Sequence, residues 1–168
     1  WMMGVVFNNF QSAAVGLCVL VVFARCFQKK KIDGVGNFWQ DLWRTFAYIL
    51  LPLSFVFSLL LVSQGVPQNF KKNLVIQQYD QTVSLTQTIP MGPFAIQDSI
   101  KLLGTNGGSF TQANGASPIE NPTGFSLFLS LVMMMLLPST CCFLFAYLTE
   151  QKKVGWYLWG MMWCMTTI

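Results

Sequence analysis

The most constraining feature of this chain is the spacing of its few charged residues. Only 10% of its 168 residues are charged and 54% are hydrophobic, whereas an average soluble domain carries about 25% charged residues. Charge-free runs cover residues 1–24, 45–70, 121–149 and 154–168. A helix needs about 20 mainly apolar residues to cross a bilayer, and the first three runs reach that length. The sequence therefore predicts an all-α polytopic membrane protein.

The fourth run and the opening residues both suggest a piece of a longer protein. As a helix, residues 154–168 would extend only ~22 Å across a hydrocarbon core of ~30 Å. Trp1 leads directly into apolar sequence without a basic n-region or a small-residue cleavage site, which argues against a signal peptide. We therefore expect an internal fragment whose last span is incomplete.

Basic residues mark the expected orientation in the membrane. The net charge is +4, and seven of the ten basic residues lie in the two short segments that join the first span to the second and the third to the fourth. These are Arg25, Lys29, Lys30, Lys31, Arg44, Lys152 and Lys153. The positive-inside rule places such short loops in the cytoplasm and the long segment between the second and third spans outside. A nucleic-acid partner is not expected, because no soluble domain presents these residues.

The expected organisation alternates spans with loops. Residues 1–27 form a span, 28–43 a cytoplasmic loop, 44–63 a span, 64–90 an external loop, 91–124 a re-entrant segment, 125–148 a span, 149–153 a cytoplasmic loop and 154–168 an incomplete span. Within the external loop, the alternating pieces at 74–76 and 83–85 suggest a short hairpin. Pro52 is expected to kink the second span, and Trp39 and Trp43 to anchor the preceding loop at the interface.

Polar side chains in the first span need partners inside the membrane. Its outer half carries Asn8, Asn9, Gln11 and Ser12. Because amides in lipid must be satisfied, we expect this face to meet protein or water. Contact with a neighbouring helix is the simpler interpretation, and contact with water is the alternative.

Several classes of site are disfavoured by residue type. All five cysteines lie within or at the ends of apolar runs, without CxxC spacing, and the chain has no histidine. Zinc binding and histidine-based catalysis are therefore not expected, and the cysteines are interpreted as small buried hydrophobes.

The most informative stretch covers residues 91–124. Pro93 can begin a helix, and residues 94–103 then have helical spacing over ~15 Å, about half a bilayer. The sequence GTNGGS follows at residues 104–109, and a polar, irregular return leads to the third span. A half-length helix, a glycine turn and an extended return between two full spans form the layout of a re-entrant pore loop.

A pore loop of this composition is suited to a monovalent cation. Glycines accept positive φ, so successive carbonyls can point the same way, and a ring of carbonyls can replace the hydration shell of an ion. The C-terminal end of the half-length helix adds partial negative charge. Thr105 and Asn106 offer further neutral oxygens, whereas Mg²⁺ and Ca²⁺ sites favour carboxylates.

Other interpretations of this stretch remain open. A Gly-Gly pair after a helix is often only a C-cap and loop. A nucleotide loop is disfavoured, because GTNGGS lacks the Lys-Ser/Thr pair and follows a helix. Asp98 and Lys101 are three residues apart and can pair, a structural role that we favour over a repulsive gate near the ion path. Glu120 is expected to pin the return segment.

The motifs together resemble one family. They are VFNNF at 6–10, GNFWQDL at 36–42, SQG at 63–65, QNF at 68–70, PMGP at 90–93, LGTNGG at 103–108, AN at 113–114 and ENPT at 120–123. Their number, order and spacing resemble the KdpA family, the potassium-binding subunits of bacterial potassium-transporting P-type ATPases. The resemblance covers nearly the whole chain.

That resemblance implies a potassium-channel-like fold with four span–pore loop–span repeats in one chain. This stretch is similar to the second repeat, preceded by the closing span of the first and followed by the start of the third. It implies a filter strand formed by Thr105, Asn106, Gly107 and Gly108, with Asp98, Lys101 and Gly104 supporting the pore helix. Potassium would be the bound substrate, with no other metal or cofactor and no catalytic residue.

The resemblance also implies a location and partners. The chain would lie in the bacterial plasma membrane as part of an ATP-driven potassium uptake complex, with a separate catalytic P-type ATPase subunit and small accessory subunits. The alternative is a non-conducting structural or docking subunit. Departures from the family pattern, at Ser109, Thr111, Gln112 and Ser117, lie just outside the filter and affect the packing behind it.

Overall fold

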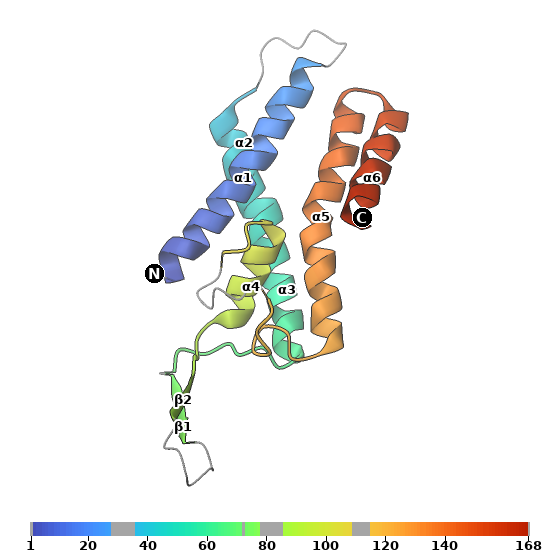
Figure 1. The fold of residues 1–168 in the computed structure, drawn as a ribbon. Coiled ribbons are helices and arrows are strands. Elements are labelled where there is room, and N and C mark those ends of the chain that lie inside the picture. The colour runs from blue at the N-terminus through green and yellow to red at the C-terminus, as the bar shows by residue number, and fades with distance from the viewer. Residues whose placement is uncertain (1, 28–35, 72, 78–85, 109–114, 168) are drawn as a thin grey trace.

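The computed structural model describes residues 2–27, 36–71, 73–77, 86–108 and 115–167. Its helices and strands are drawn in Figure 1. In chain order they are α1 (Met2–Cys26), α2 (Phe38–Arg44), the π-helical segment η1 (Thr45–Leu50), α3 (Leu51–Ser63), β1 (Leu74–Gln77), β2 (Thr86–Ile89), α4 (Phe94–Leu103), α5 (Gly124–Leu148) and α6 (Lys152–Thr167).

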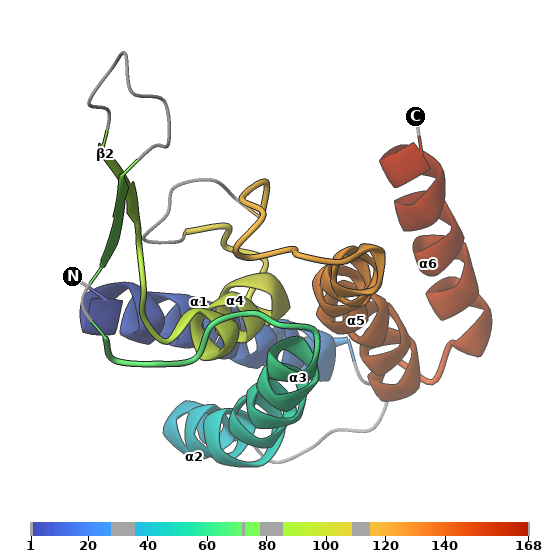
Figure 2. The same cartoon turned by 90° about the horizontal axis from the view of Figure 1, so that it is seen from below.

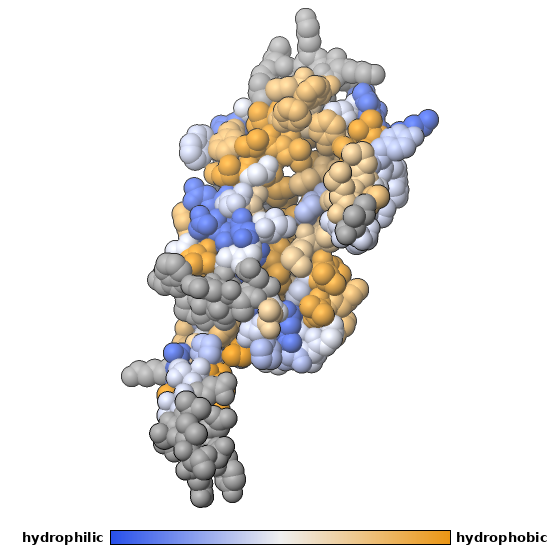
Figure 3. Space-filling model, viewed as in Figure 1, coloured by the Kyte–Doolittle hydropathy of each residue, from blue (hydrophilic) through white to orange (hydrophobic). Residues whose placement is uncertain are grey.

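Three helical stretches are long and apolar enough to cross a membrane. They are Met3–Cys26, Phe38–Ser63 and Gly124–Leu148. Only 22% of the most hydrophobic window in each is buried inside the protein, so most of this apolar surface is available to lipid or to further protein. Figure 3 shows hydrophobic side chains over much of the helical surface. The predicted fold class, an all-α membrane protein, is confirmed.

The two ends of the bundle differ in the connections that they carry. The C-terminal end of α1, the start of α2 and the α5–α6 turn lie at one end, and the β-hairpin and the start of α5 lie at the other (Figure 1). Arg25 and Lys153 therefore share one end, and Lys71, between α3 and β1, belongs to the other. This arrangement is compatible with the predicted topology, whose orientation stays a prediction.

The second spanning stretch begins earlier than the expected boundary at residue 44. Asn37 caps α2, because its Oδ1 accepts hydrogen bonds from the backbone N–H groups of Trp39 at 3.1 Å and Gln40 at 3.3 Å. Asparagine is a favoured N-cap residue for this reason. Residues 38–43 of the expected loop are thus helical, and Trp39 and Trp43 remain exposed, as interfacial anchors would be.

A change of helix type lies where the sequence predicts a kink. The Leu51 N–H donates to the Phe46 carbonyl, five residues back, which is the π-helical pattern. Pro52 follows at once and has no N–H to donate. The irregularity before a proline gives this helix a place to bend, because short π segments interrupt the regular hydrogen-bond ladder.

The segment between α3 and α4 contains the predicted hairpin, with its second strand later in the chain than expected. Antiparallel strands β1 and β2 pair Leu74 with Ile89 and Gln77 with Thr86. The first strand coincides with the alternating piece expected at 74–76. The second strand follows the piece expected at 83–85, which lies outside the described residues.

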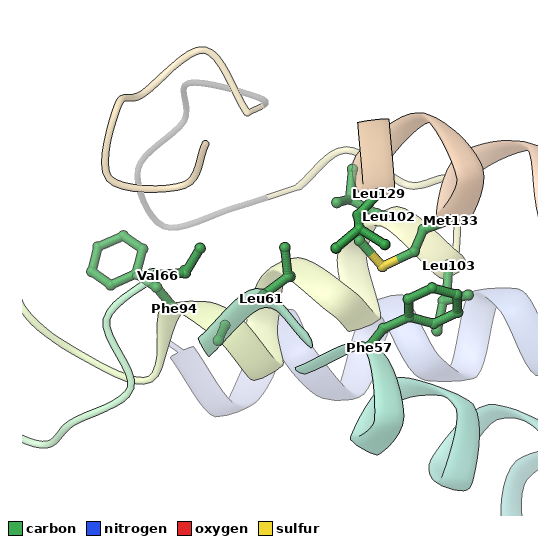
Figure 4. Packing of buried hydrophobic residues seen from close by; sticks show 9 residues of the cluster. Phe57, Leu61, Val66, Phe94, Leu102, Leu103, Leu129 and Met133 are labelled. Carbon is green, nitrogen blue, oxygen red and sulfur yellow. The ribbon is translucent and has the colours of Figure 1, made fainter. Parts of the chain in front are cut away.

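Two apolar clusters meet on α4. One joins it to α3 and α5, and Figure 4 shows its side chains distributed along α4; its buried members are Phe57, Leu61, Val66, Phe94, Ala95, Leu102, Leu103, Leu129 and Met133. The other joins α4 to α1, η1 and α5 through Phe10, Ala14, Leu50, Ile100 and Leu137. Because both clusters use α4, this short helix is the centre of the fold.

Candidate functional site: a re-entrant pore loop

Helix α4 enters the bundle from one end and stops part of the way through. It extends from the end that carries the hairpin to about the middle of the bundle, and residues 115–123 lie back at that end, before α5 begins (Figure 1). In Figure 2, α4 lies beside α1, α3 and α5, and it contacts all three. All ten residues except Ile96 are buried. The ten-residue helix predicted from the sequence is confirmed, with the same bounds.

The start of α4 is held by the loop that follows α3. The Pro67 carbonyl accepts from the backbone N–H of Phe94 at 3.1 Å and of Ala95 at 3.3 Å. The Gln68 Oε1 accepts from the Ile96 N–H at 3.2 Å. These bonds satisfy N–H groups that a helix start leaves without partners. Pro93 precedes the helix rather than beginning it. No local pattern in the sequence indicates this role for Pro67 or Gln68, because their partners on α4 lie 27 or 28 residues away.

The end of α4 is closed by backbone bonds from the glycine turn. The N–H groups of Gly104, Thr105 and Asn106 donate to the carbonyls of Ile100, Leu102 and Lys101, at 2.9, 3.2 and 3.3 Å. Thr105 has a φ of 54° and Gly107 a φ of 69°. A β-branched residue rarely adopts positive φ, so Thr105 is held there by its surroundings.

Gly104 allows the turn to approach α1 closely. A Cβ atom at this position would lie 2.8 Å from the Asn106 Nδ2, 3.1 Å from the Asn9 carbonyl oxygen and 3.2 Å from the Ile100 carbonyl oxygen. Two of these neighbours are backbone atoms and cannot move aside easily. A glycine is therefore required at Gly104, in line with the supporting role expected for it.

The side chains of Thr105 and Asn106 are engaged within the protein. The Thr105 hydroxyl donates to the Gly104 carbonyl at 2.8 Å. The Asn106 Nδ2 donates to the Asn9 carbonyl at 3.0 Å, and its Oδ1 accepts from the Ser12 hydroxyl at 2.9 Å. The Asn106 Oδ1 suggested as an ion ligand thus accepts from another partner, whereas the Thr105 hydroxyl donates its proton and keeps its oxygen lone pairs.

The polar half of the first span meets this turn. Besides its bond with Asn106, Asn9 donates from Nδ2 to the Gly108 carbonyl at 3.0 Å. Asn8 and Gln11, by contrast, are exposed. The expectation that this face would contact protein is confirmed for Asn9 and Ser12. Figure 3 shows hydrophilic surface where α1 passes the end of α4.

A buried charge cluster lies beside α4. The Lys101 Nζ is 2.7 Å from the Asp98 Oδ1 and 3.3 Å from the Glu120 Oε2, and all three residues are at most 2% exposed. The predicted Asp98–Lys101 pair is confirmed. At 2.7 Å the contact is a close ion pair between the ammonium and the carboxylate.

Glu120 also organises the return segment. Its Oε2 accepts from the Gly115 N–H at 2.7 Å, and the Gly115 carbonyl accepts from the Asn121 Nδ2 at 2.6 Å. The Asn121 Oδ1 in turn accepts from the Ser130 hydroxyl of α5 at 3.0 Å. The expected pinning role of Glu120 is confirmed.

One of the four departures from the family pattern can be placed. The Ser117 carbonyl accepts from the N–H groups of Glu120 and Asn121, each at 3.0 Å. Any residue could offer that carbonyl, but the Ser117 hydroxyl also accepts from the Ile119 N–H at 3.3 Å, so this side chain contributes to the turn that presents Glu120. Ser109, Thr111 and Gln112 lie outside the described residues.

The glycine turn borders an open groove of about 500 Å³. Thr105 and Gly107 line it from the turn, together with Lys101 and Leu102 of α4, Met134, Met135 and Pro138 of α5, and Met162 and Thr166 of α6. The turn is therefore attached to α1 on one side and open on another. Its backbone is accessible to water or to a small ion.

Comparison with known proteins agrees with this arrangement. The family model described as KdpA, the potassium-transporting ATPase A subunit, matches residues 1–168. The chain is also similar to three proteins named potassium-transporting ATPase potassium-binding subunit. Identity is 44% for the protein of Hydrogenobaculum sp. over 95% of this chain, 46% for that of Clostridium botulinum strain Alaska E43 over 92%, and 40% for that of Klebsiella pneumoniae over 99%.

The matches cover only part of each relative. The aligned region is 28% of the first two relatives and 29% of the third, so the chain spans somewhat more than a quarter of their length. The family model nevertheless matches from the first residue to the last. This chain belongs to the KdpA family of potassium-transporting ATPase A subunits.

Proposed function

We propose that this chain supplies one of the pore loops of a potassium filter, within the potassium-binding subunit of an ATP-driven uptake complex in the bacterial plasma membrane. The observation that carries the proposal is the position of the glycine turn. It lies at the inner end of a buried half-length helix, part of the way through the bundle, beside an open groove. Irregular backbone at such a depth is tolerated in membranes only where protein or water surrounds it.

The chemistry of the turn suits potassium. Carbonyl oxygens of residues 105–107 are neutral ligands of the kind that replaces the hydration shell of a weakly hydrated ion. The C-terminal end of α4 points into the turn and carries partial negative charge. Positive φ at Thr105 and Gly107 changes the direction of successive peptide groups. One strand offers ligands on one side of an ion only, so the filter is completed by the other pore loops that the family resemblance implies.

The partners follow from the relatives' names and from the family. Those relatives are potassium-binding subunits of a potassium-transporting ATPase, which implies a separate subunit for ATP hydrolysis and, by the family resemblance, small accessory subunits. Potassium would reach Thr105, Asn106, Gly107 and Gly108 from the external side. Asp98, Lys101 and Gly104 would hold the pore helix and turn in place.

The test is Gly107→Ala in the full-length subunit, assembled with its partners. A methyl group at φ 69° costs about 1–3 kcal/mol or rotates the peptide away. We expect normal assembly, a half-saturating potassium concentration for ATPase activity that rises about tenfold, and weaker discrimination against rubidium and sodium. Unchanged affinity and selectivity would favour the alternative, a structural or docking subunit whose glycine turn binds no ion.

The matched control is Gly65→Ala. Gly65 also has positive φ, at 97°, and an added Cβ would meet only the Pro122 ring, at 4.0 Å. It lies in the loop after α3, outside the turn. Its substitution should carry a similar backbone strain and leave potassium affinity and selectivity unchanged. A loss of selectivity in both variants would point to a general effect of strain.

A further inference from the structure

Asn9 on α1 forms hydrogen bonds with two residues of the glycine turn, Asn106 and Gly108. Its side chain donates from Nδ2 to the Gly108 carbonyl, and its own backbone carbonyl accepts from the Asn106 Nδ2, both at 3.0 Å. Ser12, nearly one helical turn further along α1, donates to the Asn106 Oδ1 at 2.9 Å. We call Asn9, Ser12, Asn106 and Gly108 the α1 clamp.

Within the clamp, Asn9 is buried, whereas Ser12, Asn106 and Gly108 are exposed. Asn9 is 2% exposed although it lies on a span with mostly exposed apolar surface. A buried amide that makes directed bonds fixes the geometry of its partners, because an unpaired polar group in this setting is costly. The missing Cβ of Gly104 permits the approach. The bonded residues are 94 to 99 positions apart in the chain, so the clamp forms only when the tertiary structure brings α1 and the turn together.

We propose that Asn9 is a positioning residue for potassium selectivity, an inference that rests on the function proposed above. The Gly108 carbonyl is directed towards Asn9 Nδ2 on α1 and serves as an anchor rather than as an ion ligand. With the Gly108 peptide group fixed on one side and Asn106 on the other, the peptide group of Gly107 between them has little freedom. The clamp thereby determines where the Gly107 carbonyl points.

A second consequence concerns the link between repeats. By the family resemblance, α1 closes the first repeat, whereas the turn belongs to the second. The clamp therefore couples the filter strand of one repeat to the closing span of its neighbour. A change in the tilt of α1 would be transmitted to the Gly108 peptide group through Asn9.

The test compares Asn9→Leu with Asn8→Leu in the full-length subunit, assembled with its partners. Leucine has the same number of side-chain heavy atoms as asparagine, with the same branch point, but has no donor for the Gly108 carbonyl. Asn8 is adjacent on α1 and exposed, so it controls for added apolarity. For Asn9→Leu we expect a half-saturating potassium concentration that rises about 3- to 10-fold, the effect of one lost hydrogen bond, with a reduced preference for potassium over rubidium. Asn8→Leu should behave as wild type.

A less disruptive variant keeps the test valid if Asn9→Leu fails to fold. Ser12→Ala removes only the bond to the Asn106 Oδ1 and leaves the buried core intact, so it should assemble normally and change potassium affinity in the same direction by about two- to threefold. Gly107→Ala, measured in the same assay, distinguishes the proposed role of the clamp from the proposed role of the filter. A changed selectivity in Gly107→Ala with wild-type selectivity in both Asn9→Leu and Ser12→Ala would overturn the clamp alone. Unchanged selectivity in all three variants would overturn the filter as well.

Discussion

The ammonium of Lys101 lies 3.3 Å from the Glu120 carboxylate and thereby joins the pore helix to the return segment. Asp98 lies on its other side. Ionisable residues at membrane depth are costly and commonly serve a function. Here two acidic side chains and one basic side chain are packed together, and Glu120 extends the connection to Gly115.

Replacing Lys101 should strongly destabilise the protein. Lys101→Met keeps the length of the side chain but leaves two buried carboxylates without their cation, which costs about 3–5 kcal/mol. We expect a clearly lower thermal unfolding midpoint for the full-length subunit in detergent. Lys71→Met, at an exposed lysine, is the matched control and should unfold as wild type does. Equal midpoints for the two variants would contradict a structural role. A rise in passive potassium flux at unchanged stability would instead identify Lys101 as a repulsive gate.

The strained backbone at Thr105 gives a second prediction. Thr105→Gly removes a β-branched side chain at a φ of 54°, a conformation that costs about 1–3 kcal/mol. The unfolding midpoint should not fall, whereas selectivity for potassium over rubidium should weaken, because glycine leaves the turn freer to rearrange. The measurements are thermal unfolding and ion-dependent ATPase activity.

Glu150 supplies the control for that experiment. It has a similar φ of 59° but lies in the α5–α6 turn, where the Gln151 N–H closes the helix on the Ala146 carbonyl at 3.0 Å. Glu150→Gly should likewise preserve stability, because glycine is the favoured residue after a helix end, and it should leave selectivity unchanged. If Thr105→Gly also keeps full selectivity, the strain at Thr105 has no role in ion discrimination.

Topology gives a third prediction, which labelling can check. In a full-length subunit whose native cysteines are replaced, Lys71→Cys should react with a membrane-impermeant maleimide applied to spheroplasts. Lys153→Cys should react only after permeabilisation, because the short basic loops are expected on the cytoplasmic side. Both lysines are exposed, so accessibility within the protein does not distinguish them. The opposite labelling pattern would reverse the assignment of the filter to the external side.

Local sequence patterns predicted the elements but not all of their boundaries. The apolar runs indicated the spans, and the spacing of residues 94–103 indicated α4, because hydropathy and helical periodicity are local properties. The start of α2 was missed, since the Asn37 cap precedes it within a polar loop. The hairpin was expected, but its second strand, Thr86–Ile89, follows the piece that had been considered.

What the sequence by itself determined is the class of protein, its membrane segments and the position of the glycine turn, because each depends on residues close together in the chain. Only the tertiary structure decided which partners hold that turn. The Asn9 bond to Gly108 joins residues 99 positions apart, and the Lys101 contact with Glu120 crosses from the pore helix to the return segment. A polar residue in an apolar span indicates that its side chain needs a hydrogen-bond partner. The identity of that partner depends on how the helices pack, since the chain brings these groups together only when α4 packs against α1, α3 and α5.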